Sequence, residues 1–173
     1  MDDLLTERLA LHPLSLAEAE RVLTGEPDDG ARWASGYPDD GDRAGARRFL
    51  DTCADTGDPQ PFGAYEIRRR EGGHAIGGLG FHGPADETGS VTIGYGLILP
   101  ARGKGYAGEA LRALLLFAHS RGITRVKGDT AHDNIASQRV MSSVGMRLVA
   151  EDGQLKHFET AWSDATAATG HRP

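Results

Sequence analysis

A strand, a glycine loop and a helix follow one another without interruption at residues 90–121, and this succession limits the fold more than any other segment. Apolar and small residues alternate strictly over 90–97, which is the period of a half-buried strand. Pro100 ends the strand, the loop Arg102–Ala107 (RGKGYA) follows, and helical spacing continues to Gly122. Glycines that open a helix leave backbone N–H groups free at its positive end. The segment therefore predicts an anion-binding loop in an α/β fold.

The rest of the chain alternates in the same way between strand and helix periods. Three strands joined by tight turns across 62–99 predict an antiparallel meander. The residue Asp42 is expected to cap a helix that runs to about residue 53. We expect one α/β domain over residues 1–163, with a mixed, largely antiparallel sheet of about seven strands flanked by about four helices. Residues 164–173 are expected to form a flexible tail.

Composition excludes several classes of function. Nineteen basic and 25 acidic residues leave a net charge of −6, which predicts neither a nucleic-acid nor a membrane partner. The longest strictly apolar run, 113–118, is far shorter than a membrane span. Cys53 is the single cysteine, so we expect no intrachain disulfide and a cytoplasmic location. The histidines show no paired spacing, so no metal site is predicted.

Three known anion loops compete for the segment 102–107. A P-loop needs Ser or Thr after Gly-Lys, and position 105 is glycine. A dinucleotide-binding fingerprint is spelled by Gly103, Gly105 and Gly108. In that fold, however, the first glycine follows its strand at once, whereas Pro100–Arg102 intervene here and few residues remain for further units. An NAD-binding protein therefore remains only as a less favoured alternative.

The third loop, Arg-x-x-Gly-x-Ala, is matched by Arg102, Gly105 and Ala107, and it makes the sequence resemble the GNAT superfamily of acetyl-CoA-dependent N-acetyltransferases. Four further segments carry the resemblance: Glu7–Leu11 (ERLAL), Ile76–Gly83 (IGGLGFHG), Ile93–Tyr95 (IGY) and Asn134–Met146 (NIASQRVMSSVGM). The last segment is similar to the branch that contains the Rim-type ribosomal-protein N-terminal-amine acetyltransferases.

The resemblance implies acetyl-CoA as co-substrate and a cofactor site between two splayed strands. The backbone of Leu97, Ile98 and Leu99 would face the pantetheine, with the N–H near Leu97 holding the thioester carbonyl. The pyrophosphate would lie on Arg102, Gly103, Lys104, Gly105, Tyr106 and Ala107. Asn134 would bind the pantetheine arm, although asparagine is also a common helix cap.

Two positions depart from the wider family. A tyrosine often protonates the leaving thiolate, but the aligned residue is Met141, so the resemblance assigns that role to Ser137. A satisfied first-turn serine is its structural alternative. The glutamate that often precedes Ile-Gly-Tyr is replaced by Thr92, which is no base at pH 7. His82, His157 and Glu159 are the remaining candidates for the base.

The expected activity is acetyl transfer from acetyl-CoA to a primary amine, either a protein N-terminal α-amine or a small molecule, by direct attack in a ternary complex. Trp33 and Tyr37 lie in a Gly/Pro/Asp loop where the family builds its acceptor cleft, and they either line that cleft or pack the loop onto the core. A homodimer is compatible with this interpretation. The non-enzymatic alternative is a CoA-binding or sensory module that lacks turnover.

Overall fold

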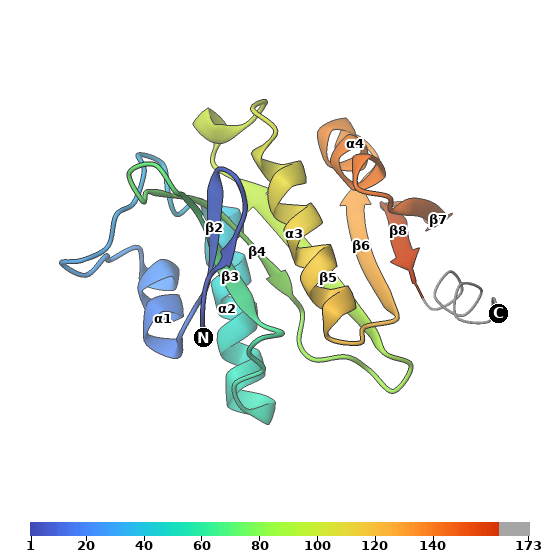
Figure 1. The fold of residues 1–173 in the computed structure, drawn as a ribbon, viewed down its shortest axis with the longest axis horizontal. Coiled ribbons are helices and arrows are strands. Elements are labelled where there is room, and N and C mark those ends of the chain that lie inside the picture. The colour runs from blue at the N-terminus through green and yellow to red at the C-terminus, as the bar shows by residue number, and fades with distance from the viewer. Residues whose placement is uncertain (163–173) are drawn as a thin grey trace.

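The computed structural model describes residues 1–162 and shows one mixed β-sheet with helices on both faces (Figure 1). The strands are β1 (Leu4–Leu5), β2 (Leu9–Pro13), β3 (Ala64–Arg69), β4 (Ala75–Phe81), β5 (Ser90–Leu97), β6 (Arg125–Ala131), β7 (Arg147–Glu151) and β8 (Leu155–Ala161). The helices are α1 (Leu16–Thr24), α2 (Asp40–Thr56), α3 (Tyr106–Ser120) and α4 (Ile135–Ser143). The tail expected at 164–173 lies outside the described residues.

The order of the sheet is β1-β2-β3-β4-β5-β6-β8-β7. Neighbouring strands are antiparallel except β5 and β6, which run parallel because α3 connects them as a crossover. The mixed, largely antiparallel sheet predicted from the sequence is confirmed. The additional strand is β1, whose two residues are too few to produce an alternating pattern.

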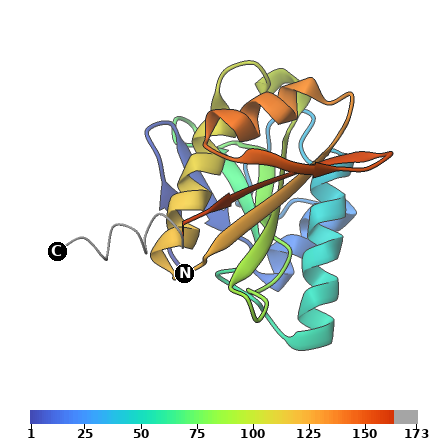
Figure 2. The same ribbon diagram turned by 90° about the vertical axis from the view of Figure 1, so that its right-hand side faces the viewer.

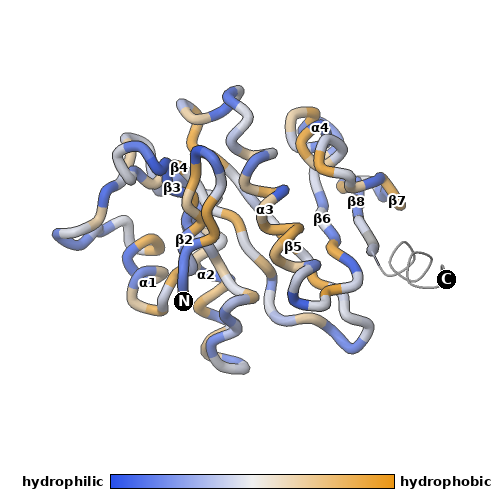
Figure 3. The backbone as a smooth tube through the Cα atoms, in the orientation of Figure 1, coloured by the Kyte–Doolittle hydropathy of each residue, from blue (hydrophilic) through white to orange (hydrophobic). Residues whose placement is uncertain are grey.

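Helices α2 and α3 lie on opposite sides of the sheet (Figure 2). Helix α3 buries a stripe that includes Leu111 and Leu114, and orange segments alternate with paler ones along it in Figure 3. This stripe and the buried side chains of the central strands form the core. No helix within residues 1–162 has the length and apolar character needed to cross a membrane.

The start of α2 differs from the sequence prediction. Asp39, not Asp42, is the N-cap, and Asp42 occupies the third helical position. The Asp39 carboxylate accepts from the Asp42 N–H at 3.0 Å, and Asp42 accepts from the Asp39 N–H at 2.9 Å. Both aspartates belong to one capping box, so the earlier one starts the helix.

Candidate active site

The parallel pair β5–β6 separates part-way along its length. Register pairs run from Ser90–Arg125 to Ile93–Gly128, although β5 continues to Leu97 and β6 to Ala131. A cavity of about 320 Å³, here called the notch, opens where the strands separate. It is lined by Ile93, Gly94, Tyr95, Gly128, Asp129, Thr130, Ala131, Asn134, Ser137, Met141 and Leu155. This is the splayed arrangement implied by the family resemblance.

The end of β5 runs past its last pair with β6, and Leu97–Leu99 are not among the residues that line the notch. The Ile98 N–H donates to the Ile76 carbonyl at 2.9 Å, on the β4 side. Because N–H groups alternate in direction along an antiparallel strand, the Leu97 N–H points the other way, past the last β5–β6 pair. The Leu97 carbonyl accepts from Arg102 Nε at 3.0 Å, which ties the strand end to the following loop.

The glycine loop opens α3 with free backbone groups. Gly103 and Gly105 have φ angles of 77° and 83°, in the left-handed region that glycine adopts without steric cost. Gly105 is the N-cap of α3, and no side chain caps this helix end. A Cβ on Gly103 would meet no atom within 4 Å, so the loop surface is open to a ligand. The expected anion site at Arg102–Ala107 thus has the required local geometry.

Asn134 and Ser137 meet at the start of α4. Asn134 is the N-cap, and its Oδ1 accepts from the Ser137 N–H at 3.1 Å. The Ser137 hydroxyl is therefore not used in capping; it lies 2.8 Å from the hydroxyl of Tyr95. Sequence reasoning missed Tyr95 as a site residue, although the Ile-Gly-Tyr motif contained it. Met141, which stands where a tyrosine was expected, is buried.

A second cavity of about 370 Å³, here called the cleft, lies between α2 and the glycine-rich faces of β4 and β5. Gly78 and Gly80 of β4, and Gly94 and Gly96 of β5, are among its lining residues. The cleft and the notch share Ile93, Gly94, Tyr95 and Asp129. A group in the notch and a group in the cleft can therefore meet at β5.

His82 lines the cleft beside this junction. A Cβ on Gly94 would stand 3.1 Å from its Nε2, so the ring lies directly over β5. Burial lowers the pKa of His82 below its ordinary value, and the charge of Arg48 lowers it further. The imidazole is therefore mainly neutral near pH 7 and able to accept a proton.

The two aromatic residues of the 25–39 loop, Trp33 and Tyr37, line different cavities. Tyr37 lines the cleft, but it is buried and its hydroxyl donates to Glu66 Oε2 at 2.7 Å. Trp33 packs edge-on against Tyr37, with ring centroids 5.5 Å apart, and lines another cavity of about 410 Å³ with Arg68. Of the two, Tyr37 alone is among the residues lining the cleft.

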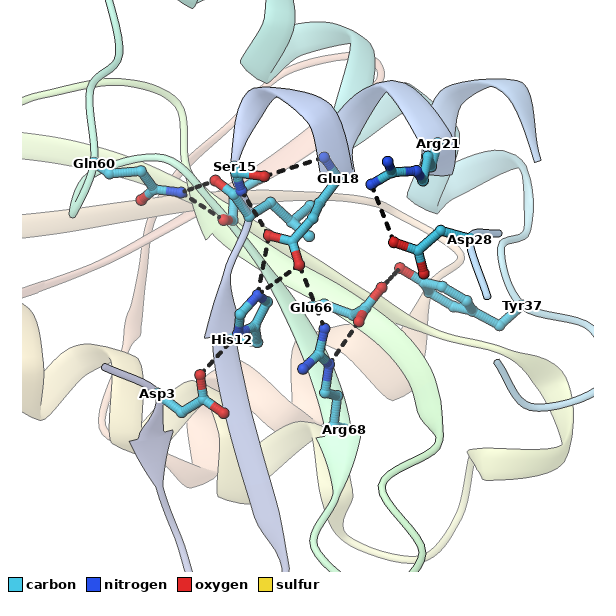
Figure 4. Close-up of polar contacts among 12 residues, drawn as sticks. Asp3, His12, Ser15, Glu18, Arg21, Asp28, Tyr37, Gln60, Glu66 and Arg68 are labelled. Atoms are coloured by element: carbon cyan, nitrogen blue, oxygen red, sulfur yellow. Dashed lines mark hydrogen bonds and ion pairs between the residues drawn. The ribbon is translucent and has the colours of Figure 1, made fainter. Parts of the chain in front are cut away.

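A polar network holds this loop and α1 on the sheet (Figure 4). Arg68 Nε contacts the other oxygen of Glu66 at 2.7 Å, and Arg68 also lies 3.8 Å from Glu18. Glu18 in turn contacts His12. Since Glu66 is only 4% exposed, its bonds to Tyr37 and Arg68 are required to offset its burial. Tyr37 therefore anchors the wall of the cleft.

The other two base candidates lie on β8. Both ring nitrogens of His157 contact carboxylates: Nδ1 lies 2.7 Å from Asp129 and Nε2 lies 3.0 Å from Asp152. These contacts raise the pKa of His157 and leave no ring nitrogen directed at the cleft. Glu159 pairs with Arg125 at 3.4 Å and is not among the residues lining the notch or the cleft. Asp129, which sequence reasoning did not place in this site, is the carboxylate at the junction.

Within residues 1–162, no group of three or more His, Cys, Asp or Glu side chains is placed to hold a metal ion.

The split sheet beside an uncapped glycine loop is the arrangement that the family resemblance implied. Residues 8–147 match the acetyltransferase (GNAT) domain family, and the protein belongs to that family. The fold and the family predicted from sequence motifs are thereby confirmed.

Named relatives are N-acetyltransferases. The uncharacterized N-acetyltransferase YjdG of Bacillus subtilis strain 168 is 33% identical over 98 residues, which cover 56% of this chain and only 58% of that protein. The uncharacterized N-acetyltransferase p20 of Bacillus licheniformis is 26% identical over 162 residues, 93% of this chain and 89% of that protein. The solved structure of RimL, a ribosomal-protein alpha-N-acetyltransferase in complex with coenzyme A, aligns with a TM-score of 0.67. It is 16% identical, and the alignment covers 92% of this chain and 98% of that chain. At this identity the comparison shows that the two proteins share a fold.

Proposed function

We propose that this protein transfers an acetyl group from acetyl-CoA to a primary amine by direct attack in a ternary complex. The observation that carries the proposal is the junction of notch and cleft at Gly94, Tyr95 and Asp129. A thioester entering through the notch and an amine entering through the cleft would meet there without a covalent enzyme intermediate.

The cofactor side of the proposal uses the notch and the loop. The pyrophosphate would bind the backbone N–H groups of 102–107, and the pantetheine would lie along Leu97–Leu99 with Asn134 opposite. The Leu97 N–H would hold the thioester oxygen, on which negative charge develops during attack. The direction of that N–H away from β4 supports this role.

The chemical step requires two proton-handling groups. The amine nitrogen attacks the acetyl carbon, the C–S bond breaks, and its electron pair stays on sulfur. The Ser137 hydroxyl, hydrogen-bonded to Tyr95, would donate its proton to the departing thiolate and take up a replacement proton from solvent. His82 would accept the proton that the amine loses, because its neutral ring lies over β5 at the junction.

The acceptor is proposed to be an amine that is substantially neutral near pH 7, such as a protein N-terminal α-amine or a small-molecule amine. Deprotonating a lysine at pH 7 costs roughly 4.6 kcal/mol, against about 1.4 for an α-amine with a pKa near 8. A histidine with a lowered pKa is too weak a base to remove this difference. We therefore expect α-amines to react over 100-fold faster than lysines, from the difference of about 3 kcal/mol.

The test is release of the CoA thiol from acetyl-CoA across a panel of amines, including peptides with one free α-amine or one free lysine, at pH 6 to 9. Thiol release that favours α-amines supports the proposal. Calorimetric binding of CoA without thiol release from any amine would instead indicate a CoA-binding module. Binding of NAD in place of CoA would return the loop to the dinucleotide-binding class.

A further inference from the structure

Arg8, just before β2, reaches the glycine loop from a part of the chain that precedes it by more than ninety residues. Its Nη1 donates to the Lys104 carbonyl at 2.9 Å, and its guanidinium lies 4.4 Å from the centroid of the Tyr106 ring. Its Nε contacts Glu109 Oε1 at 2.7 Å. One side chain thus touches the loop, the first helical residue of α3 and the first turn of that helix.

A second set of bonds fixes Glu109 itself. Its Oε2 accepts from the Arg8 backbone N–H at 2.8 Å and from the Thr6 hydroxyl at 2.5 Å. The residues between β1 and β2 are therefore clamped to the start of α3 by backbone and side-chain contacts together. These contacts are separate from the sheet pairing, in which β2 bonds only to β1 and β3.

The bond to Lys104 controls the direction of a backbone donor. In a planar trans peptide, the carbonyl of one residue and the N–H of the next point in opposite directions. With the Lys104 carbonyl turned toward Arg8, the Gly105 N–H must point away from Arg8. Gly103 and Gly105 are both in the left-handed region, where glycine has wide freedom, so this peptide unit needs an external contact to hold it.

The ion pair also removes an unfavourable charge. Glu109 lies in the first turn of α3, where a carboxylate would repel a pyrophosphate bound at the same helix end. Arg8 compensates that charge at 2.7 Å.

We infer that Arg8 is a positioning residue for the cofactor: it holds the 104–105 peptide in the orientation that presents the Gly105 N–H to the pyrophosphate. The inference rests on the proposed acetyl-CoA site. Arg8 acts on the cofactor through the loop, and its charge is already paired with Glu109. Binding the Lys104 carbonyl and Glu109 at the same time requires the two-pronged guanidinium group, which a lysine ammonium does not provide.

The test compares Arg8→Ala with Arg70→Ala. Arg70 is a matched control because it donates to the Thr6 carbonyl at 2.7 Å, in the same segment, and its removal changes the net charge equally. Arg8→Ala is expected to raise the Kd for CoA about tenfold, and Arg70→Ala to leave it within about twofold. The KM for acetyl-pantetheine, which lacks the pyrophosphate, should be the same in wild type and Arg8→Ala. A merely structural defect would raise both constants.

The variants Arg8→Lys and Arg8→Ala/Glu109→Gln separate positioning from charge. Arg8→Lys is expected to bind CoA as weakly as Arg8→Ala, and the double variant to recover only the part of the affinity that the unpaired Glu109 charge removes, because neither restores the fork to the Lys104 carbonyl. Recovery of wild-type affinity in either variant, or wild-type affinity in Arg8→Ala itself, would overturn the inference while leaving the proposed function intact. Failure of the wild-type protein to bind CoA would overturn both.

Discussion

The hydroxyl oxygens of Tyr95 and Ser137 lie 2.8 Å apart, although 42 residues separate them in the chain. Tyr95 belongs to β5 and Ser137 to α4, so the bond crosses the notch. Tyr95 also lies within 3.0 Å of the Ser137 carbonyl. When the Tyr95 hydroxyl donates to that carbonyl, the Tyr95 oxygen can accept a hydrogen bond from the Ser137 hydroxyl. If the serine hydroxyl turns toward a thiolate, a solvent molecule can donate to Tyr95 in its place.

Ser137→Ala is expected to lower kcat by about 10²- to 10⁴-fold with little change in CoA affinity, because general acid catalysis typically contributes that much. Tyr95→Phe should give a smaller loss, since it removes only the support of the serine. Ser142→Ala, at an exposed position of the same helix, is the control. Full kcat in Ser137→Ala would show that water protonates the thiolate.

Gly105→Glu is expected to abolish CoA binding, because it places a negative charge in the pyrophosphate loop and its Cβ would lie 3.3 Å from Nη2 of Arg8, the side chain that holds that loop. Gly122, beyond the other end of α3, has the same φ of 83° and no atom within 4 Å of an added Cβ. Gly122→Glu therefore carries the same backbone strain, on the order of 1 kcal/mol, without reaching the loop. Calorimetry should find CoA binding in Gly122→Glu alone; equal affinity in both variants would contradict the loop assignment.

His82→Gln is expected to lower kcat/KM about 100-fold at pH 7. Protonation of an α-amine substrate lowers kcat/KM below about pH 8 in every variant, and in the wild-type protein a second acid limb should appear below pH 6.5, because burial lowers the pKa of His82. The variant should lose this limb. His157→Gln is the comparison, and loss of the limb in that variant instead would move the base to β8.

Asp42→Asn is expected to stabilise the protein at high pH. Burial raises the pKa of Asp42 to about 7, above the ordinary value near 3.9 of the unfolded chain. The folded state therefore binds a proton that the unfolded state lacks between about pH 4 and pH 7, and stability falls as pH rises through that window. The variant does not ionise, so its free energy of unfolding should exceed that of wild type by about 2 kcal/mol at pH 8 and by little at pH 4.5. Urea unfolding at both pH values measures this.

Asp40→Asn, at an exposed neighbouring position, should change stability equally at the two pH values. A constant difference between Asp42→Asn and wild type would mean that Asp42 titrates normally.

Local pattern was sufficient for most of the fold. Alternation placed β3 to β5, and the glycine loop placed the start of α3. These features depend on residues a few positions apart, which a single sequence displays directly. The choice between Asp39 and Asp42 failed because both are good caps within one turn, and the two belong to one capping box in which the earlier residue starts the helix.

The site was predictable where a motif is contiguous and not where distant segments meet. The loop, Asn134 and Ser137 stood in recognisable runs. Tyr95, Asp129 and Arg8 acquire their positions from pairing between β5, β6 and β8 and from the contact of the β1–β2 turn with α3. These contacts join segments that are far apart in the sequence, and no spacing pattern predicts them. From the sequence, the three residues therefore could not be distinguished from ordinary surface or core positions.

Strands β5 and β6 are paired at only four positions, and both continue beyond the last pair. The unpaired backbone of the two strands therefore forms an edge inside the sheet. An outer edge of this kind would recruit a neighbouring strand and promote aggregation. Here the unpaired backbone borders the notch, where the proposed cofactor would bring amide groups of its own. Such a molecule would act as a short substitute strand that joins β1–β5 to β6–β8, and local unfolding of the C-terminal half would become rarer as its concentration rises.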